Sequence, residues 1–239
     1  MSGEEEPPRD VPGPQALTRE WLLKGELPAL LAKLLPGVRV LTDEERRASL
    51  DAILAARPEH GDGVWLFAYG SLIWNPTIHY RARRLVRARD WHRSFCLYAR
   101  AGRGTPENPG LMLGLKPGGA CTGAAFRIEE ALVEQELDVL WRREMVAEGY
   151  IPRWLTIEDA EGREIGGAIA FTINPAGAAY CGDLPEAEVV RLLATARGGL
   201  GTAAEYLFNT RDGLRQMGIA DEFVERLAEL VEAAMKGVG

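Results

Sequence analysis

The order of the predicted secondary-structure elements is the sequence feature that most limits what this chain can fold into. Short apolar segments typical of strands are concentrated between residues 64 and 173, where Gly- and Pro-rich stretches separate them. These segments are Val64–Tyr69, Phe95–Arg100, Leu111–Lys116, Cys121–Ile128, Arg153–Ile157 and Ile165–Ile173. The helical patterns span about 129–147, 184–197, 201–217 and 220–236. Because strands and helices do not alternate regularly, a doubly wound parallel sheet is disfavoured, and the order predicts an α+β domain with a small, mostly antiparallel sheet or barrel.

Composition divides the chain into three regions. Residues 1–14 are acidic and rich in proline, and we expect them to form a disordered tail. Residues 15–60 carry two helical patterns, and the second starts at Thr42 with Glu45 three residues later, which is the signature of a capping box. We interpret this region as an N-terminal helical extension that precedes the main domain, residues 61–236.

Composition and charge also exclude several classes of function. Hydrophobic residues make up 46% of the 239 residues, so the chain can bury a core without metal or disulfide cross-links. The net charge of −7 argues against nucleic acid and anionic membranes as partners, and no apolar run approaches the ~18 residues of a membrane span. The three cysteines form no CxxC pair and the histidines no metal-ligand spacing, which predicts a cytoplasmic protein without a metal site. We interpret the arginines between residues 81 and 93 as a solvated strand-and-turn surface.

One carboxylate stands out in the helical pattern at about 129–147. Spacings of three and four place on one helix face Val133, Leu137, Leu140, Trp141 and Glu144. A carboxylate at the end of an apolar face is desolvated, which raises its pKa and suits it to general acid–base catalysis. The alternative is that Glu144 forms an ion pair with a nearby arginine: Arg142, Arg143 or Arg153. We expect the acids off this face to be solvated: Glu129, Glu134 and Glu136.

A second candidate is the stretch VWLFAYGSLIWNP, Val64 to Pro76, in which an apolar strand runs directly into Gly70 and Ser71. At the end of a strand, the backbone N–H groups of Gly70, Ser71 and Leu72 can point into a cavity and bind an anion. Glycine lets a ligand approach the backbone closely. The alternative is an ordinary tight turn. The stretch is not G-x-S-x-G, so a hydrolase nucleophile elbow is not indicated.

With these residues in view, the chain resembles the ChaC-type γ-glutamylcyclotransferases, and in particular the bacterial form of the glutathione-specific branch. Four blocks carry the resemblance, in the order WLFAYGSLIWNP, WHRSFCLYARAGRGTPENPGLMLGLKPGG, LWRREMVAEGYIPRWL and GGLGTAAEYLFNT. The resemblance implies the γ-glutamylcyclotransferase-like α+β fold, which is a small mixed or antiparallel β-barrel flanked by helices.

The resemblance also implies a reaction and the residues that carry it. Glutathione would be converted to 5-oxoproline and cysteinylglycine without a cofactor or metal. The catalytic glutamate of the family falls on Glu144, as general acid and base. The substrate-binding positions fall on Ala68, Tyr69, Gly70, Ser71, Leu72, Ile73 and, in a later segment, Tyr180. The chain departs from the family pattern at Ala203, where asparagine is frequent, and at Ala68, where many members have glycine.

The expected partner is therefore a small molecule, glutathione, with neither nucleic acid nor membrane, and the expected state is a monomer or weak dimer. Two alternatives stay open. The first is a non-catalytic binding module of the cation-transport regulator type. The second is a cyclotransferase that acts on other γ-glutamyl amines. The presence of Glu144 and of the YGSL loop favours catalysis over the first alternative.

Overall fold

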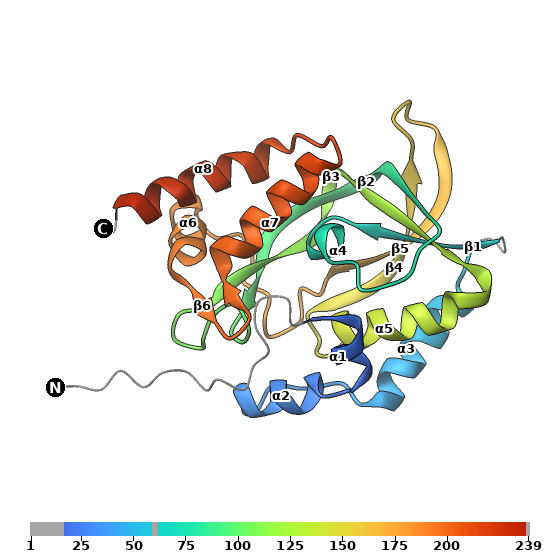
Figure 1. The fold of residues 1–239 in the computed structure, drawn as a ribbon, viewed down its shortest axis with the longest axis horizontal. Helices are drawn as coiled ribbons and strands as arrows, with labels where there is room; N and C mark the ends of the chain where they lie inside the picture. The colour runs from blue at the N-terminus through green and yellow to red at the C-terminus, as the bar shows by residue number, and fades with distance from the viewer. Residues whose placement is uncertain (1–16, 59–61, 238–239) are drawn as a thin grey trace.

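In the computed structural model, which describes residues 17–58 and 62–237, a closed barrel forms the centre of the molecule (Figure 1). Its strands are β1 (Gly63–Ala68), β2 (Ala82–Ala99), β3 (Gly110–Glu129), β4 (Tyr150–Glu158) and β5 (Glu164–Ile173). They follow one another around the barrel in the order β1-β3-β2-β4-β5. Parallel pairing of β1 with β5 closes the barrel, and the other neighbours are antiparallel. The prediction of an α+β fold with a small mixed barrel is confirmed.

The strands β2 and β3 are longer than the sequence pattern predicts. β2 begins at Ala82, well before the predicted segment, and β3 joins two predicted segments into one strand that runs through Gly118. The two strands pair along their lengths, from Ala82 opposite Arg127 to Ala99 opposite Gly110. This long pairing satisfies the backbone hydrogen-bonding groups of the first half of β2. The arginines of that segment obscure the apolar alternation that is typical of a strand.

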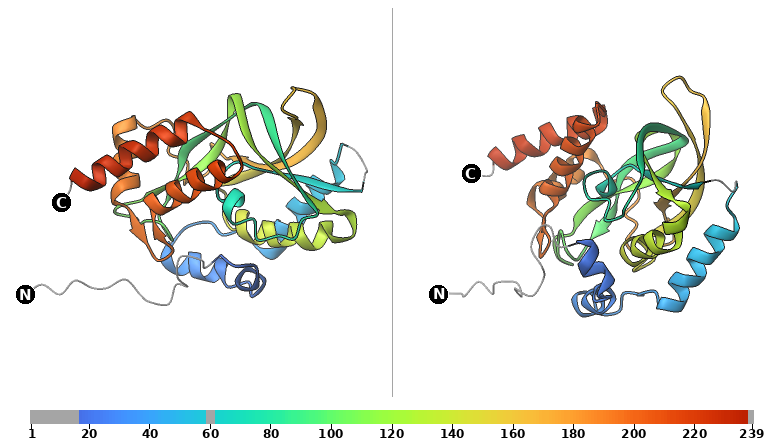
Figure 2. Two further views of the ribbon diagram at one scale, coloured as in Figure 1. Left: turned by 45° about the horizontal axis from the view of Figure 1, so that its top comes forward. Right: turned by 45° about the vertical axis from the view of Figure 1, so that its right-hand side comes forward.

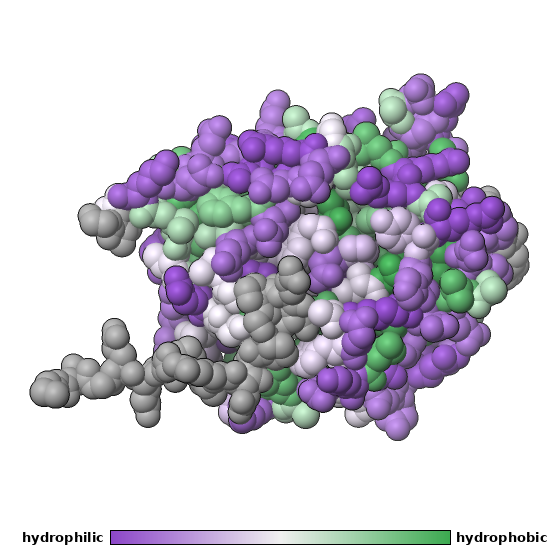
Figure 3. All heavy atoms as spheres, viewed as in Figure 1, coloured by the Kyte–Doolittle hydropathy of each residue, from purple (hydrophilic) through white to green (hydrophobic). Residues whose placement is uncertain are grey.

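The helices lie on two sides of the barrel, as the turned views in Figure 2 show. On one side α6 (Glu186–Thr195), α7 (Ala203–Gln216) and α8 (Glu222–Gly237) pack together. Polar side chains cover the outer surface of α8 (Figure 3), while its inner face buries apolar side chains such as Val224, Leu227 and Val231. Among residues 17–58 and 62–237, no helix combines the length and the apolar character that a membrane crossing requires.

On the other side of the barrel lies α5 (Val133–Glu144), which follows a 3₁₀ turn, Glu130–Leu132. Its predicted apolar face is buried, and Trp141 is packed edge-on against Phe171 of β5 at a ring-centroid distance of 5.2 Å. This contact fixes the position of the helix against the barrel. It therefore also fixes the position of Glu144, the last residue of the helix.

The N-terminal extension packs on the outer side of α5 (Figure 1). It comprises α1 (Arg19–Leu23), α2 (Leu27–Leu34) and α3 (Asp43–Ala55), so the first predicted helical pattern is two short helices. Gly25, with φ of +70°, lies at the break between them. The capping box of Thr42 and Glu45 is confirmed at the start of α3. The predicted disordered tail lies outside the described residues.

Glu136 of α5 corrects one expectation from the sequence. We expect it to be solvated, but it is fully buried beneath α1. Both of its carboxylate oxygens accept hydrogen bonds from Arg19, and the backbone N–H of His79 donates to it at 2.9 Å. Burial raises the pKa of Glu136, but the hydrogen bonds from Arg19 and His79 outweigh burial and hold it below its usual value. The periodicity of α5 does not reveal that a second helix covers its outer face.

Candidate active site

Glu144 lies at the C-terminal end of α5 with only 11% of its side chain exposed. Burial raises the pKa of this carboxyl group, and the adjacent Arg143 guanidinium only partly offsets that effect. The Nε atom of Arg143 lies 2.9 Å from Oε1, yet this contact lacks hydrogen-bond geometry, and Oε1 has no hydrogen-bond donor among the described residues. The structure thus contains both the desolvated carboxylate and one of the ion pairs that the sequence leaves as alternatives. The burial of the carboxyl group and the missing donor both favour its neutral form over its charged form.

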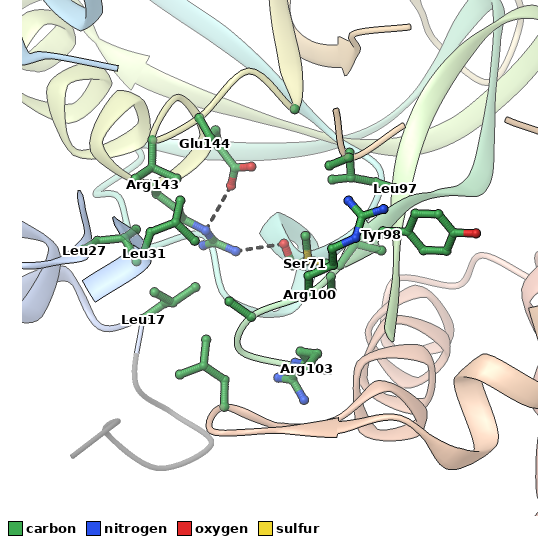
Figure 4. Close-up of a pocket in the computed structure, with 18 of the residues that line it drawn as sticks. Leu17, Leu27, Leu31, Ser71, Leu97, Tyr98, Arg100, Arg103, Arg143 and Glu144 are labelled. Atoms are coloured by element: carbon green, nitrogen blue, oxygen red, sulfur yellow. Dashed lines mark hydrogen bonds and ion pairs between the residues drawn. The ribbon is translucent and has the colours of Figure 1, made fainter. Parts of the chain in front are cut away.

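Arg143 connects the end of α5 to the loop that follows β1 (Figure 4). Its Nη2 donates to the hydroxyl of Ser71 at 2.8 Å, and its Nη1 donates to the backbone oxygen of Asn75. The planar guanidinium donates in fixed directions, so these hydrogen bonds hold the end of α5 and the loop after β1 in a fixed relative position. Arg143 therefore fixes the distance between Glu144 and the YGSL loop.

A second buried arginine, Arg93 of β2, holds the same loop from its other side. Its Nε donates to the backbone oxygen of Tyr69 at 3.1 Å, and its remaining nitrogens donate to Thr122 and Asp221. The interpretation of the arginine-rich segment as a solvated surface is therefore wrong for Arg93. The sequence pattern does not show this, because Asp221 comes from the distant start of α8.

The YGSL loop itself combines a fixed backbone with free donors. Gly70 precedes the short helix α4 (Ser71–Trp74), and its oxygen accepts from Ile73 N–H at 2.9 Å. Among the described residues, none accepts a hydrogen bond from the N–H groups of Gly70, Ser71 or Leu72. A Cβ atom added to Gly70 would lie 3.1 Å from the hydroxyl of Tyr206. This close contact with the pocket wall is a physical reason for glycine at that position.

Buried phenols complete the inner cavity. Tyr150 donates its hydroxyl to the Leu113 oxygen at 3.0 Å, and the Tyr206 hydroxyl accepts from Leu113 N–H at 3.4 Å. Burial raises the pKa of Tyr206 to about 12 and the pKa values of Tyr69 and Tyr150 well above their usual value. All three are neutral near pH 7, and the hydroxyl hydrogen of Tyr206 has no acceptor among the described residues. Tyr206 can therefore donate a hydrogen bond to a ligand.

These groups line two adjoining hollows. The inner one is lined by Tyr69, Gly70, Ser71, Leu72, Leu113, Glu144, Tyr150, Phe171 and Tyr206. The outer one, a cavity of about 260 Å³, shares Ser71, Glu144, Tyr150 and Tyr206 with it and extends between the N-terminal helices and the end of β2. Together they form a partly open pocket in which Glu144 is shared by both hollows.

The structure brings together most of the residues predicted from the sequence. Tyr69, Gly70, Ser71, Leu72 and Glu144 line the inner hollow. Three other predicted residues lie elsewhere. Ala68 and Ile73 are buried next to the loop and do not line the hollow, and Tyr180 forms a β-bridge with Leu97 and packs against Cys96 and Ile173.

Neither Tyr150 nor Tyr206 is assigned to the site from the sequence, and Tyr206 lies on α7. The capping box of Thr202 and Glu205 is a local signal that α7 begins just before this tyrosine. The residues around Tyr206 in the sequence do not determine which face of α7 packs against the barrel. In the described part of the chain, no group of three or more His, Cys, Asp or Glu side chains is arranged to hold a metal ion.

Comparison with known proteins identifies the family. The family model described as ChaC-like protein matches residues 64–234. The chain belongs to the ChaC family. Among ChaC relatives, a glutathione-specific gamma-glutamylcyclotransferase of Escherichia coli K12 is 40% identical over 206 residues, which cover 86% of this chain and 88% of that protein. Gamma-glutamylcyclotransferase 2-1 of Arabidopsis thaliana is 32% identical over 176 residues, covering 70% and 82%.

Solved structures of the same fold agree with this assignment. A crystal structure of a γ-glutamyl cyclotransferase specific to glutathione from yeast superposes with a TM-score of 0.65 at 21% sequence identity. The match covers 72% of this chain and 97% of that one. At this identity the similarity establishes the ChaC-type fold. The resemblance read from the four sequence blocks is confirmed.

Proposed function

We propose that this ChaC protein is a glutathione-specific γ-glutamylcyclotransferase, with Glu144 as its general acid and base. The names of the bacterial, plant and yeast relatives support the activity. The observation on which the assignment depends is the largely buried carboxyl group of Glu144, which lines the inner hollow together with the YGSL loop. A desolvated carboxyl group next to a binding loop suits proton transfer.

The proposed reaction is intramolecular, because the α-amine of the substrate attacks the γ-carbonyl of the same molecule. The α-ammonium of the γ-glutamyl group transfers a proton to Glu144, and the resulting amine attacks the γ-carbonyl carbon to form a five-membered ring. Glu144 returns this proton to the cysteine nitrogen as its C–N bond breaks, and the second proton lost by the attacking nitrogen passes to the same nitrogen, so that the ring keeps one N–H and cysteinylglycine leaves as an ammonium. The products are 5-oxoproline and cysteinylglycine, no water is consumed, and Glu144 ends as it began. The protein must supply proximity and proton transfer.

The loop and the phenols account for binding in this proposal. The free N–H groups of Gly70, Ser71 and Leu72 hold an anionic oxygen of the substrate, either of the α-carboxylate or of the tetrahedral intermediate. The hydroxyl of Tyr206 supplies a further donor on the opposite wall. Arg143 and Arg93 keep the loop rigid, so these donors are in place before the substrate arrives.

The location and oligomeric state follow from the same proposal. The cysteines Cys96, Cys121 and Cys181 are all free thiols, which suits the reducing cytoplasm where glutathione is abundant. A monomer or weak dimer suffices, because a single chain supplies every group that the reaction uses.

A substrate panel tests the assignment. Purified protein is incubated with glutathione, γ-glutamylalanine and a γ-glutamylamine, and 5-oxoproline is quantified. We expect release from glutathione and much less from the other two. Release from γ-glutamylalanine at an equal rate would move the substrate class to γ-glutamyl amines in general. A protein that binds glutathione without releasing 5-oxoproline would instead have a non-catalytic role.

A further inference from the structure

The outer cavity contains cations that the proposed reaction does not use. Among the described residues that line it, the charged ones are Arg100, Arg103, Arg143 and Glu144. Arg143 is engaged by Glu144, Ser71 and Asn75. Arg100 and Arg103 follow the end of β2, and Figure 4 shows Arg100 across Ser71 from Arg143 and Arg103 below Ser71. These two arginines are the charges left to meet a ligand.

Arg103 is held in a way that leaves part of its guanidinium available. Its side chain is 9% exposed, and Nη1 donates to the Thr202 oxygen at 3.0 Å. Glu205 lies 3.6 Å from the same Nη1, and it also closes the capping box of α7. Neither Nε nor Nη2 has an acceptor among the described residues. Arg103 therefore lines the cavity as a buried cation with two nitrogens that no described residue engages.

Arg100 is half-buried in the wall of the same cavity. Its Nη1 donates to the Ala178 oxygen at 3.1 Å, and its guanidinium lies over the ring of Tyr98 at 4.8 Å from the centroid. These contacts restrict the side chain, which lowers the entropy lost when it binds an anion. Most of the rest of the cavity wall is apolar, including Leu27 and Leu31 of α2. A cation lined by apolar groups attracts an anion more strongly than one in open solvent.

The arrangement matches the far end of the proposed substrate, so this inference rests on the proposed function. With the γ-glutamyl group against the YGSL loop and Glu144, where no arginine lines the inner hollow, the peptide beyond the scissile amide extends into the outer cavity. Two extended residues span about 7 Å, which places the terminal carboxylate of glutathione in the outer cavity. We propose that Arg103, assisted by Arg100, forms a subsite for the glycine carboxylate of glutathione and so selects a tripeptide over shorter γ-glutamyl compounds.

Turnover of matched substrates tests the subsite. The substrates are glutathione, glutathione with its glycine carboxylate converted to an amide, and γ-glutamylcysteine, whose carboxylate lies one residue closer to the ring. For the unmodified chain we expect kcat/KM to fall about 10- to 100-fold on the amide, the scale of a hydrogen bond to a charged group. In Arg103→Gln, kcat/KM on glutathione should fall by a similar factor and kcat/KM on the amide should stay unchanged.

Two further variants separate recognition from structure. Arg87→Gln removes the same charge from an exposed position on β2 and should leave both substrates unaffected. Arg100→Gln should cause a severalfold loss on glutathione alone, and it decides the matter if Arg103→Gln does not fold. Equal turnover of glutathione and its amide by the unmodified chain would overturn the subsite. A loss of equal size on both substrates in Arg103→Gln and Arg100→Gln would do the same, because it would show a purely structural role.

Binding separates failure of the subsite from failure of the proposed function. Calorimetric titration of the Glu144→Gln variant with glutathione and with its amide measures recognition without turnover. Weaker binding of the amide, in a protein whose unmodified form releases no 5-oxoproline, would keep the subsite and reject the cyclotransferase. Normal release of 5-oxoproline together with equal affinities would reject the subsite alone.

Discussion

Replacing Glu144 by glutamine tests the central claim about the site, because it removes the charge and the basic oxygen and preserves the shape. We expect turnover of glutathione to fall at least ~10²-fold, the usual scale for a general acid–base group. The release of 5-oxoproline under substrate saturation measures this loss. Turnover close to that of the unmodified chain would refute the role of Glu144.

The same variant has a second expected outcome, in stability. Burial raises the pKa of Glu144, so folding favours its neutral form, and each unit of such a shift corresponds to about 1.4 kcal/mol against the charged form. The unmodified chain therefore loses stability as pH rises from the unfolded value of 4.5 through the folded pKa. Glu144→Gln does not experience this loss, so its free energy of unfolding relative to that of the unmodified chain should rise as the pH increases above 4.5.

Urea unfolding at several pH values measures this difference. The relative rise for Glu144→Gln should be absent below pH 4.5, where the glutamate is protonated in both states. The control is Glu134→Gln on the same helix, whose side chain is 74% exposed and which should change neither turnover nor stability. If Glu144→Gln is strongly destabilised at pH 7 and the control is not, the carboxylate stabilises the fold, and our account of a desolvated, functional group is wrong.

Three further predictions follow from the site and its supports. The acidic limb of kcat/KM against pH should lie above 4.5, because burial raises the pKa of Glu144, and a limb that persists in Glu144→Gln would assign it to another group. Gly70→Ala should raise KM for glutathione about tenfold, since its Cβ would press on the Tyr206 hydroxyl at 3.1 Å; an unchanged KM argues against a tight loop. Arg19→Met should lower the free energy of unfolding by about 3 kcal/mol, because it leaves the buried Glu136 carboxylate without its cation. Thermal unfolding measures that effect, and a second change, Glu136→Gln, should restore part of the loss.

Local patterns explain which parts of the fold could be predicted. The order of strands and helices and the apolar face of α5 depend on residues close in sequence, and both agree with the structure. The first half of β2 was missed because its arginines break the usual alternation, and only Val86 and Ala88 point inward there. Its strand character comes from pairing with β3, and the register of that pairing is a property of the folded sheet.

The candidate site follows the same division. Glu144 and the YGSL loop could be found from the sequence because a helical period and a strand end are local features. The buried state of Glu136 could not, since α1 covers it from more than one hundred residues away in the chain. Tyr206 could not be assigned either, because its place in the site depends on how α7 packs against the barrel.

By itself, the sequence determined the kind of fold, the family, and the candidate roles of Glu144 and the YGSL loop, since each of these depends on residues close together in the chain. Only the tertiary structure decided that Arg143 connects the carboxylate to the loop, that Tyr206 lies against Gly70, and that Arg103 lines the outer cavity. The physical reason is that these contacts join segments separated by long stretches of chain. Their geometry is set by closure of the barrel and by the packing of helices against it.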